Sequence, residues 1–460
     1  MLVVRDLTVH AAKDRLMGPV SFTLPAGDAL VIMGETGAGK SLLAQSIMGA
    51  LPVTLHGAGE ITLESRRIDN LSSAEREALW GRAISLLPQE PWRALDPLMP
   101  AFRQVRDSHR LVGRRPPAEA EARARQDFEV LSLTGAERRR PGQLSGGMGQ
   151  RVAFAAACAG GARLLLADEP TKGLDRDRTD TIIRLLKQTP EDGGALIVVT
   201  HDIAVARAID GQILVLRNGV CVEQGAVGEV LANPQHAYTL DLIAADPANW
   251  QAPVASAPGK TVLEAQGIAI GRGQERLIEG FDLSLGAGER VAVTGPSGIG
   301  KTTLLDTLAG LLSPLAGTVR RGTGVGRTGV QKIYQDPPAA FPRLVSLGIG
   351  LRDLAELHRI AWEDIRQLVT RLRVDEAMLE RRPEQVSGGE LQRIAIARAL
   401  AVKPAVLLAD EPTSRLDPIT QKQTMALLAE AAAGAGTAVV LVTHEAALAR
   451  NWAMRTHMLT

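Results

Sequence analysis

Two stretches of the sequence carry glycines at fixed spacing, followed by a lysine and a hydroxyl residue. They are Gly34-Glu35-Thr36-Gly37-Ala38-Gly39-Lys40-Ser41 and Gly295-Pro296-Ser297-Gly298-Ile299-Gly300-Lys301-Thr302. Glycines at this spacing let backbone N–H groups turn inward around phosphates, and the helix that follows adds the positive end of its dipole. The lysine would contact the β- and γ-phosphates, and the hydroxyl would bind Mg²⁺. One such match in a glycine-rich chain can arise by chance, but two matches predict two sites for a nucleoside triphosphate with Mg²⁺.

Each glycine-rich stretch is followed, farther along the chain, by an apolar run that ends in an aspartate and a glutamate. Asp168 and Asp410 each follow four apolar residues, so each is expected at the end of a buried strand, where a carboxylate can hold Mg²⁺ through water. Glu169 and Glu411 come next and, in an extended chain, point to the other side of the strand. A glutamate there can accept a proton from an attacking water molecule or orient it.

A histidine follows each Asp-Glu pair at a nearly constant distance. His201 lies 33 residues after Asp168, and His444 lies 34 residues after Asp410. A lone histidine at a strand end is more often a structural residue with satisfied hydrogen bonds. Because this histidine recurs at the same place, we expect instead that its imidazole reaches the γ-phosphate and the attacking water.

The same motifs occur twice in the same order, which predicts two copies of one domain. A further shared block, Ser145-Gly146-Gly147, recurs as Ser387-Gly388-Gly389. We assign the first domain to residues 1–245, a short Pro- and Ala-rich linker to 246–260, and a second, C-terminally shortened domain to 261–460.

Short apolar runs alternate with helical segments in both copies, which is typical of an α/β fold with a mostly parallel sheet. The expected buried strands are Ala29–Met33, Leu164–Ala167, Arg290–Thr294 and Val406–Ala409. Ala118–Leu133 and Trp362–Leu379 have helical character. A helical insert is therefore expected between the glycine-rich loop and the Ser-Gly-Gly block of each copy.

The composition excludes several classes of protein. The 460 residues are 45% hydrophobic and 22% charged, which excludes wholesale disorder. The net charge is +1 and aromatic residues are 3% of the chain, so no nucleic-acid binding is expected. Two cysteines exclude a disulfide scaffold or a cysteine-ligated metal site. The most apolar stretch, Met425–Val442, carries Glu430 and two glycines, so it predicts a helix, a turn and a strand, not a membrane span.

The Ser-Gly-Gly blocks, each followed by Gln-Arg (Gln150-Arg151 and Gln392-Arg393), resemble the signature of ATP-binding cassette (ABC) ATPases. The resemblance covers nearly the whole chain and implies two tandem P-loop domains that hydrolyse ATP. Each would have a RecA-like core, an antiparallel β subdomain and a helical insert. In this family the signature caps the ATP of the opposite cassette in a head-to-tail sandwich. The first composite site would comprise Lys40, Ser41, Asp168, Glu169 and His201 with Ser387 and Gly389, and the second Lys301, Thr302, Asp410, Glu411 and His444 with Ser145 and Gly147.

The resemblance also assigns four residues outside these motifs. Gln89 and Gln335 look like the Q-loop glutamines that contact Mg²⁺ and sense a membrane partner. Asp175 and Asp417 look like the D-loop aspartates that cross the dimer. By this comparison both sites keep every catalytic residue, although many fused pairs of cassettes have one degenerate site.

Three local features resemble the oligopeptide, dipeptide and nickel importer branch. They are the Q-loop context Pro88–Pro97, echoed by Tyr334–Pro338, the segment Pro141–Met148 and the tail His236–Ile243, although any amphipathic C-terminal helix would also explain the tail. The branch implies one fused chain per transporter, peripheral on the cytoplasmic face of the plasma (inner) membrane. Its partners would be two integral membrane permease subunits and, indirectly, a solute-binding protein. The cargo would be a peptide, nickel or a metal–chelator complex.

Apolar residues near the two Q-loop glutamines are candidate contacts for the membrane subunits, but ordinary core packing explains each equally well. These residues are Trp92, Leu95, Phe102, Phe341 and Leu344. The alternative function is a soluble twin-cassette ATPase that acts on ribosomes or nucleic acid, or in a cytosolic enzyme complex. The short linker and the balanced charge argue against the ribosomal form, whereas nothing in the sequence excludes the enzyme complex.

Overall fold

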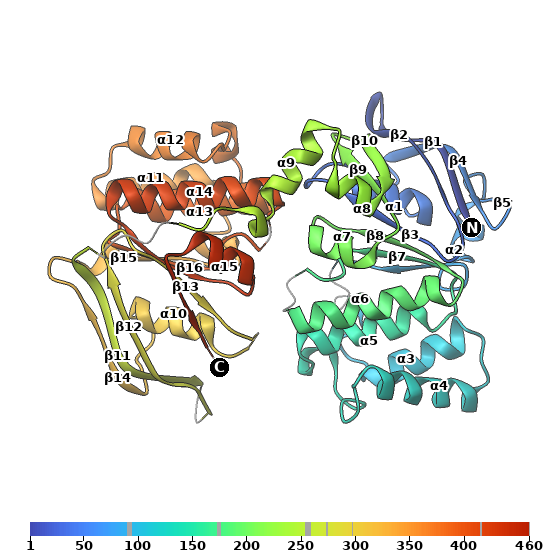
Figure 1. Cartoon of the computed structure of the whole chain (residues 1–460), viewed down its shortest axis with the longest axis horizontal. Helices are drawn as coiled ribbons and strands as arrows, with labels where there is room; N and C mark the ends of the chain where they lie inside the picture. Colours follow the sequence, from blue (N-terminus) through green and yellow to red (C-terminus); the bar gives the residue numbers. More distant parts are fainter. Residues whose placement is uncertain are drawn as a thin grey trace. The chain divides into compact units, whose positions relative to one another are not determined.

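The computed structural model describes residues 1–89, 94–172, 176–253, 259–272, 275–296, 298–414 and 416–459. The chain divides into two compact units, Met1–Ile243 and Ala244–Thr460. In Figure 1 the first unit runs from blue through green and the second from yellow to red. The proposed linker at 246–260 lies partly outside the described residues, so its boundaries stay a prediction.

A six-stranded sheet forms the centre of the first unit, in the order β10-β9-β3-β8-β7-β6. Neighbouring strands are parallel except at the edge, where β10 runs antiparallel to β9. The strands are β3 (Ala29–Met33), β6 (Ile84–Leu87), β7 (Leu164–Asp168), β8 (Ala195–Val199), β9 (Gln212–Arg217) and β10 (Val220–Ala226). Every residue of β3 and β8 is buried, as expected for strands that are covered on both faces.

A second, antiparallel sheet in this unit has the order β2-β1-β4-β5. Its strands are β1 (Leu2–Ala11), β2 (Asp14–Leu24), β4 (Leu55–Leu63) and β5 (Arg66–Arg67). Side chains from β1, β2 and β4 share one core with those of β3 and α1. The antiparallel subdomain therefore packs beside the loop that joins β3 to α1.

The helices of the first unit include the expected insert. They are α1 (Lys40–Met48), α2 (Ser73–Glu77), α3 (Ala101–Leu111), α4 (Pro117–Val130), α5 (Gly146–Cys158), α6 (Arg176–Glu191), α7 (Ile203–Ile209), α8 (Val227–Ala232) and α9 (Ala237–Ala245), of which α9 extends past the end of the unit. In the insert, α3 packs on α4, and the rings of Phe102 and Phe128 meet edge to face with their centroids 5.3 Å apart.

The second unit repeats this plan with a five-stranded parallel sheet, β15-β16-β17-β13-β18, and an antiparallel sheet, β12-β11-β14. The strands are β11 (Thr261–Arg272), β12 (Glu275–Gly286), β13 (Arg290–Thr294), β14 (Ala316–Arg321), β15 (Val330–Ile333), β16 (Val406–Asp410), β17 (Ala438–Val442) and β18 (Arg455–Met458). The helices are α10 (Lys301–Ala309), α11 (Leu347–His358), α12 (Trp362–Arg371), α13 (Gly388–Ala401), α14 (Pro418–Ala435) and α15 (Ala446–Trp452).

The four strands predicted from apolar runs are present in the fold. The stretch Met425–Val442 forms the end of α14, a turn in which Gly436 has φ 66°, and β17, as its composition predicted. In the part of the chain that the structure describes, no helix combines the length and the apolar character needed to cross a bilayer.

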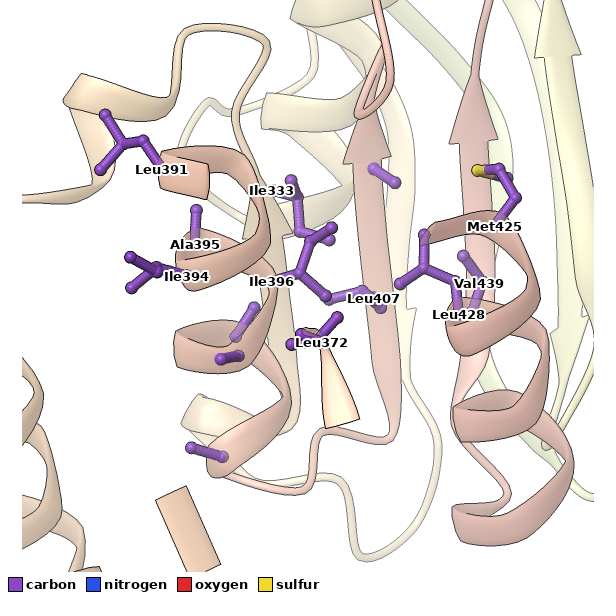
Figure 2. Close-up of a cluster of buried hydrophobic side chains, with 14 of the residues drawn as sticks. Ile333, Leu372, Leu391, Ile394, Ala395, Ile396, Leu407, Met425, Leu428 and Val439 are labelled. Atoms are coloured by element: carbon purple, nitrogen blue, oxygen red, sulfur yellow. The ribbon is translucent and has the colours of Figure 1, made fainter. Parts of the chain in front are cut away.

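Packing of α13 against the parallel sheet builds a large buried cluster in the second unit (Figure 2). Ile396 of α13 lies beside Leu407 of β16 in this view, and both are fully buried. Because α13 begins at the second Ser-Gly-Gly block, this core fixes the position of that block relative to the strand that carries Asp410.

Truncation of Ile396 to alanine should destabilise the second unit by about 2–5 kcal/mol, because it leaves a cavity among side chains that cannot fully collapse. Urea denaturation followed by tryptophan fluorescence measures the change. Leu357→Ala, at an exposed position of α11, is the control and should shift stability by no more than about 0.5 kcal/mol. Equal losses in the two variants would contradict the assignment of this core.

Candidate ATP sites

Each glycine-rich loop joins a central strand to a helix, β3 to α1 in the first unit and β13 to α10 in the second. Among the described residues, no side chain caps the start of either helix. The N-cap residues Gly39 and Gly300 have φ of 95° and 107°, which are left-handed values that favour glycine. A Cβ added at Gly37 or Gly298 would meet nothing within 4 Å, so the loop is open on that side. A helix start of this kind suits a phosphate, so both loops fit the triphosphate of ATP.

The lysine of each loop is buried and folds back over the start of the loop. Lys40 Nζ donates to the carbonyl oxygens of Gly34 and Glu35, at 2.7 and 2.9 Å. Lys301 Nζ donates in the same way to Gly295 and Pro296, at 2.7 and 3.0 Å. Two backbone acceptors therefore orient each ammonium group. Ser297, in the second loop, lies outside the described residues.

The hydroxyl residue that follows the lysine meets the aspartate at the end of the neighbouring strand. Ser41 Oγ donates to Asp168 Oδ2 at 3.1 Å. In the second unit the hydroxyl of Thr302 lies close enough to Asp410 to lower the pKa of its carboxyl group. A hydroxyl and a carboxylate beside a phosphate site are oxygen ligands that suit Mg²⁺. Burial raises the pKa of both aspartates, and the charge of Glu169 raises that of Asp168 further.

The glutamate after each aspartate pairs with the histidine of the same unit. Glu169 Oε1 lies 2.6 Å from His201 Nδ1, and Glu411 Oε1 lies 2.9 Å from His444 Nδ1. Strand alternation was expected to separate each glutamate from its aspartate, but each glutamate lies just beyond the end of its strand. The strands end at the aspartates, and Glu169 and Glu411 adopt left-handed φ of 49° and 44°. A turn out of the strand, not its pleat, directs each glutamate to its histidine.

The groups around each glutamate lower its pKa despite burial. Burial alone would raise the pKa of Glu169, but the charge and hydrogen bond of His201, together with the charges of Lys40 and Lys172, lower it. In the same way, His444, Lys301 and Gln335 together outweigh burial and lower the pKa of Glu411. Burial would lower the pKa of His444, yet the bond and charge of Glu411 raise it. An ionised carboxylate in this place can accept a proton.

The Q-loop glutamines differ between the units. Gln335 Nε2 donates to Glu411 Oε2 at 2.9 Å, so this glutamine contacts the glutamate–histidine pair directly. Gln89 is exposed. The structure therefore brings Gln335, but not Gln89, to the carboxylate.

Each Ser-Gly-Gly block begins a helix. Ser145 caps α5 by accepting from Met148 N at 3.3 Å, and Ser387 caps α13 by accepting from Glu390 N at 3.3 Å. In the second unit the glutamate side chain reaches back to Ser387 N at 2.9 Å and completes a capping box. Each block is thus held as a helix start.

The D-loop aspartates are only partly described. Asp417 caps α14 and accepts from Thr420 N at 3.0 Å, whereas Asp175 lies outside the described residues.

A buried lysine distinguishes the second site from the first. Lys332 Nζ lies 2.7 Å from Asp306 Oδ1 and 3.5 Å from Asp410 Oδ2, with its side chain 5% exposed. At the same spacing from the P-loop lysine and the Q-loop glutamine, the first unit has Gln45 and Leu86. Lys332 belongs to no motif. In the sequence it is indicated only because Lys332 and Asp306 together replace the leucine and glutamine of the first unit.

Both ATPase cores are matched by one protein-family model, that of the ABC transporter, over residues 17–172 and 278–414. The chain belongs to the ABC transporter family. It is an ATP-binding subunit that hydrolyses ATP, with two ABC ATPase cassettes in one chain.

Curated relatives match nearly the whole chain of this ABC protein. The peptidoglycan transport ATP-binding protein YejF of Agrobacterium fabrum is 33% identical over 97% of this chain and 88% of its own length. The glutathione import ATP-binding protein GsiA of Pectobacterium atrosepticum is 29% identical over 97% and 82%. A solved structure named RNase-L Inhibitor aligns with a TM-score of 0.69 at 20% identity, over 98% of this chain and 87% of that chain, and shows the likeness of fold alone.

Replacement of Lys332 by leucine should destabilise the second cassette by about 3 kcal/mol, because it leaves the buried Asp410 carboxylate and the partly exposed Asp306 without their cation. The double variant Lys332→Leu/Asp306→Gln installs the pair found in the first cassette and should recover most of the loss. Urea denaturation compares the two. A double variant no more stable than the single one would show that the ion pair is not the cause.

Proposed function

We propose that the chain is the ATP-hydrolysing subunit of an ABC importer, with two ATP·Mg²⁺ sites formed head to tail between its cassettes. The observation that carries the proposal is that each cassette has a P-loop lysine, a hydroxyl–aspartate contact and a glutamate–histidine pair. Both cassettes therefore have the phosphate-binding lysine, the aspartate for Mg²⁺ and the general base, so both sites are expected to turn over ATP.

The residues at each site have separate proposed roles. Lys40 and Lys301 bind the β- and γ-phosphates together with the N–H groups of their loops. Mg²⁺ would be held by Ser41 and Asp168 in the first cassette and by Thr302 and Asp410 in the second, with the Q-loop glutamines Gln89 and Gln335 as further oxygen donors. Mg²⁺, when bound, neutralises charge on the β- and γ-phosphates.

The glutamate of each pair is the proposed general base. Glu169 and Glu411 accept a proton from the attacking water, and His201 and His444 orient them through Nδ1. An imidazole that uses Nδ1 for the glutamate keeps Nε2 for the γ-phosphate. In-line attack of water on that phosphate then yields ADP and phosphate.

The signature blocks complete the two sites from the opposite cassette. Ser387 and Gly389 would cap the first ATP, and Ser145 and Gly147 the second, with Asp175 and Asp417 lining the shared boundary. Support comes from the open turns of the blocks, because an added Cβ at Gly146 or Gly388 meets nothing within 4 Å. A helix start with an open glycine turn is well suited to a phosphate.

The double variant Glu169→Gln/Glu411→Gln should still bind ATP but lose hydrolysis, because an amide cannot accept the proton. We expect a fall in kcat of at least about 100-fold, measured by phosphate release, while a fluorescent ATP analogue remains tightly bound. Wild-type turnover in the double variant would contradict the role given to the glutamates. The single variants test whether both sites contribute.

Import of a peptide-like compound is the transport function that the relatives favour. Their names specify peptidoglycan transport and glutathione import, and both compounds contain peptide bonds. Nickel and metal–chelator complexes remain alternative cargoes. The chain would act peripherally on the cytoplasmic face of the membrane, one copy per transporter, with two membrane permease subunits and a solute-binding protein.

The candidate docking residues separate into buried and exposed sets. Leu95 and Phe341 are buried, so core packing explains them. Phe102 packs on Phe128, and Trp92 lies outside the described residues. Leu344, by contrast, is 81% exposed.

Leu98, at the matching place in the first cassette, is 75% exposed. Both leucines lie nine residues after their Q-loop glutamine. An exposed leucine at the same place in both cassettes favours contact with two similar membrane subunits.

Leu98→Asp/Leu344→Asp should separate the chain from its membrane partners without loss of nucleotide binding. Affinity purification from detergent-solubilised membranes measures the membrane proteins that co-elute. Val53→Asp, at another exposed position, is the control and should retain them. Recovery of the wild-type chain with ribosomal or cytosolic enzyme subunits, and without two polytopic membrane proteins, would contradict the importer function but not the ATP sites.

A further inference from the structure

The hydroxyl of a buried tyrosine contacts the first P-loop from a distant part of the chain. Tyr238 lies on α9, 203 residues after Glu35, and is 2% exposed. Its hydroxyl oxygen accepts a hydrogen bond of 2.7 Å from the backbone N–H of Glu35. Glu35 is the second residue of the loop, and its carbonyl oxygen accepts from Lys40 Nζ at 2.9 Å. The tyrosine therefore holds the N–H group of Glu35, and the carbonyl oxygen of Glu35 orients the phosphate-binding lysine.

Several contacts fix the tyrosine itself. Glu223 of β10 accepts from the backbone N–H groups of Gln235 and His236, at 2.7 and 3.1 Å. His236 Nδ1 lies 3.1 Å from Tyr238 N, and the guanidinium of Arg217 stands 5.0 Å from the centre of the tyrosine ring. The start of α9 is thus tied to β9 and β10, and the hydroxyl has a defined place.

The second P-loop holds the carbonyl group that orients its lysine without a hydrogen bond of this kind. Pro296 occupies the position of Glu35, and proline has no N–H group to donate. Its carbonyl oxygen accepts from Lys301 Nζ at 3.0 Å, as that of Glu35 does from Lys40. The pyrrolidine ring restricts φ covalently, so this loop can hold its carbonyl without a hydrogen bond from a tail.

We propose that Tyr238 is a positioning residue of the first ATP site, which fixes the start of the P-loop and through it the lysine. The proposal rests on the function proposed for this site. Loss of the hydroxyl would leave a partly buried N–H group without this acceptor and would let the Glu35 carbonyl move. Nucleotide binding at the first site should then depend on α9. The second site should not depend on such a contact, because its P-loop has no N–H donor at this position.

A double-mutant cycle in the full chain tests the proposal. Lys301→Ala blocks the second site, and titration with a fluorescent ATP analogue then reports the first. Tyr238→Phe should raise Kd about three- to tenfold, the range of one net hydrogen bond. In a Glu35→Pro background, which installs the residue of the second loop, Tyr238→Phe should change Kd less than twofold. Glu35→Ala keeps the N–H group, so in that background the full effect should return.

The outcomes separate this inference from the function of the site. An equal effect of Tyr238→Phe in the proline and alanine backgrounds would mean that the hydroxyl acts through a contact other than the N–H group of residue 35, and it would overturn the proposal. No effect of Tyr238→Phe in the Lys301→Ala chain that keeps Glu35 would overturn it as well. The added variant Lys40→Ala should abolish the remaining binding. If it does not, the assignment of the ATP site itself fails, whatever the result for the tyrosine.

Discussion

The parallel order of three neighbouring strands is the constraint on which both ATP sites depend. In the first cassette β8 lies between β7 and β3, and in the second β17 lies between β16 and β13. Carboxyl ends of parallel strands meet at one edge of a sheet, where open α/β sheets bind their ligands. The aspartate, the histidine and the P-loop therefore converge, although the aspartate lies 127 residues from the serine it contacts in the first cassette.

The two cassettes place the same reacting groups but support them with different neighbours. One P-loop is held by a tyrosine hydroxyl and the other contains a proline. Lys332, which pairs with Asp306, lies beside Asp410, and the first cassette has a leucine and a glutamine in place of this lysine and aspartate. Because the supporting residues differ while the reacting groups are the same, the two sites can differ in their affinity for ATP while both keep their function.

Several contacts could not be predicted from motifs, for identifiable reasons. The pairing of each glutamate with its histidine depends on the left-handed turn at Glu169 and Glu411, which strand periodicity does not predict. Phe341 is buried and Leu344 is exposed, although both are apolar and they lie three residues apart. Such differences depend on which side of the chain meets the core, and local sequence does not specify this in an irregular loop.

The sequence by itself determined the duplication, the α/β class, the central strands and the types of residue at each ATP site, because these depend on local spacing and hydrophobic runs. Only the tertiary structure decided which groups touch. The contacts of Tyr238 with the first P-loop and of Lys332 with Asp306 and Asp410 join segments far apart in the chain. Such pairs form because folding removes water around buried polar groups, which must then find partners among whatever residues the sheet brings near.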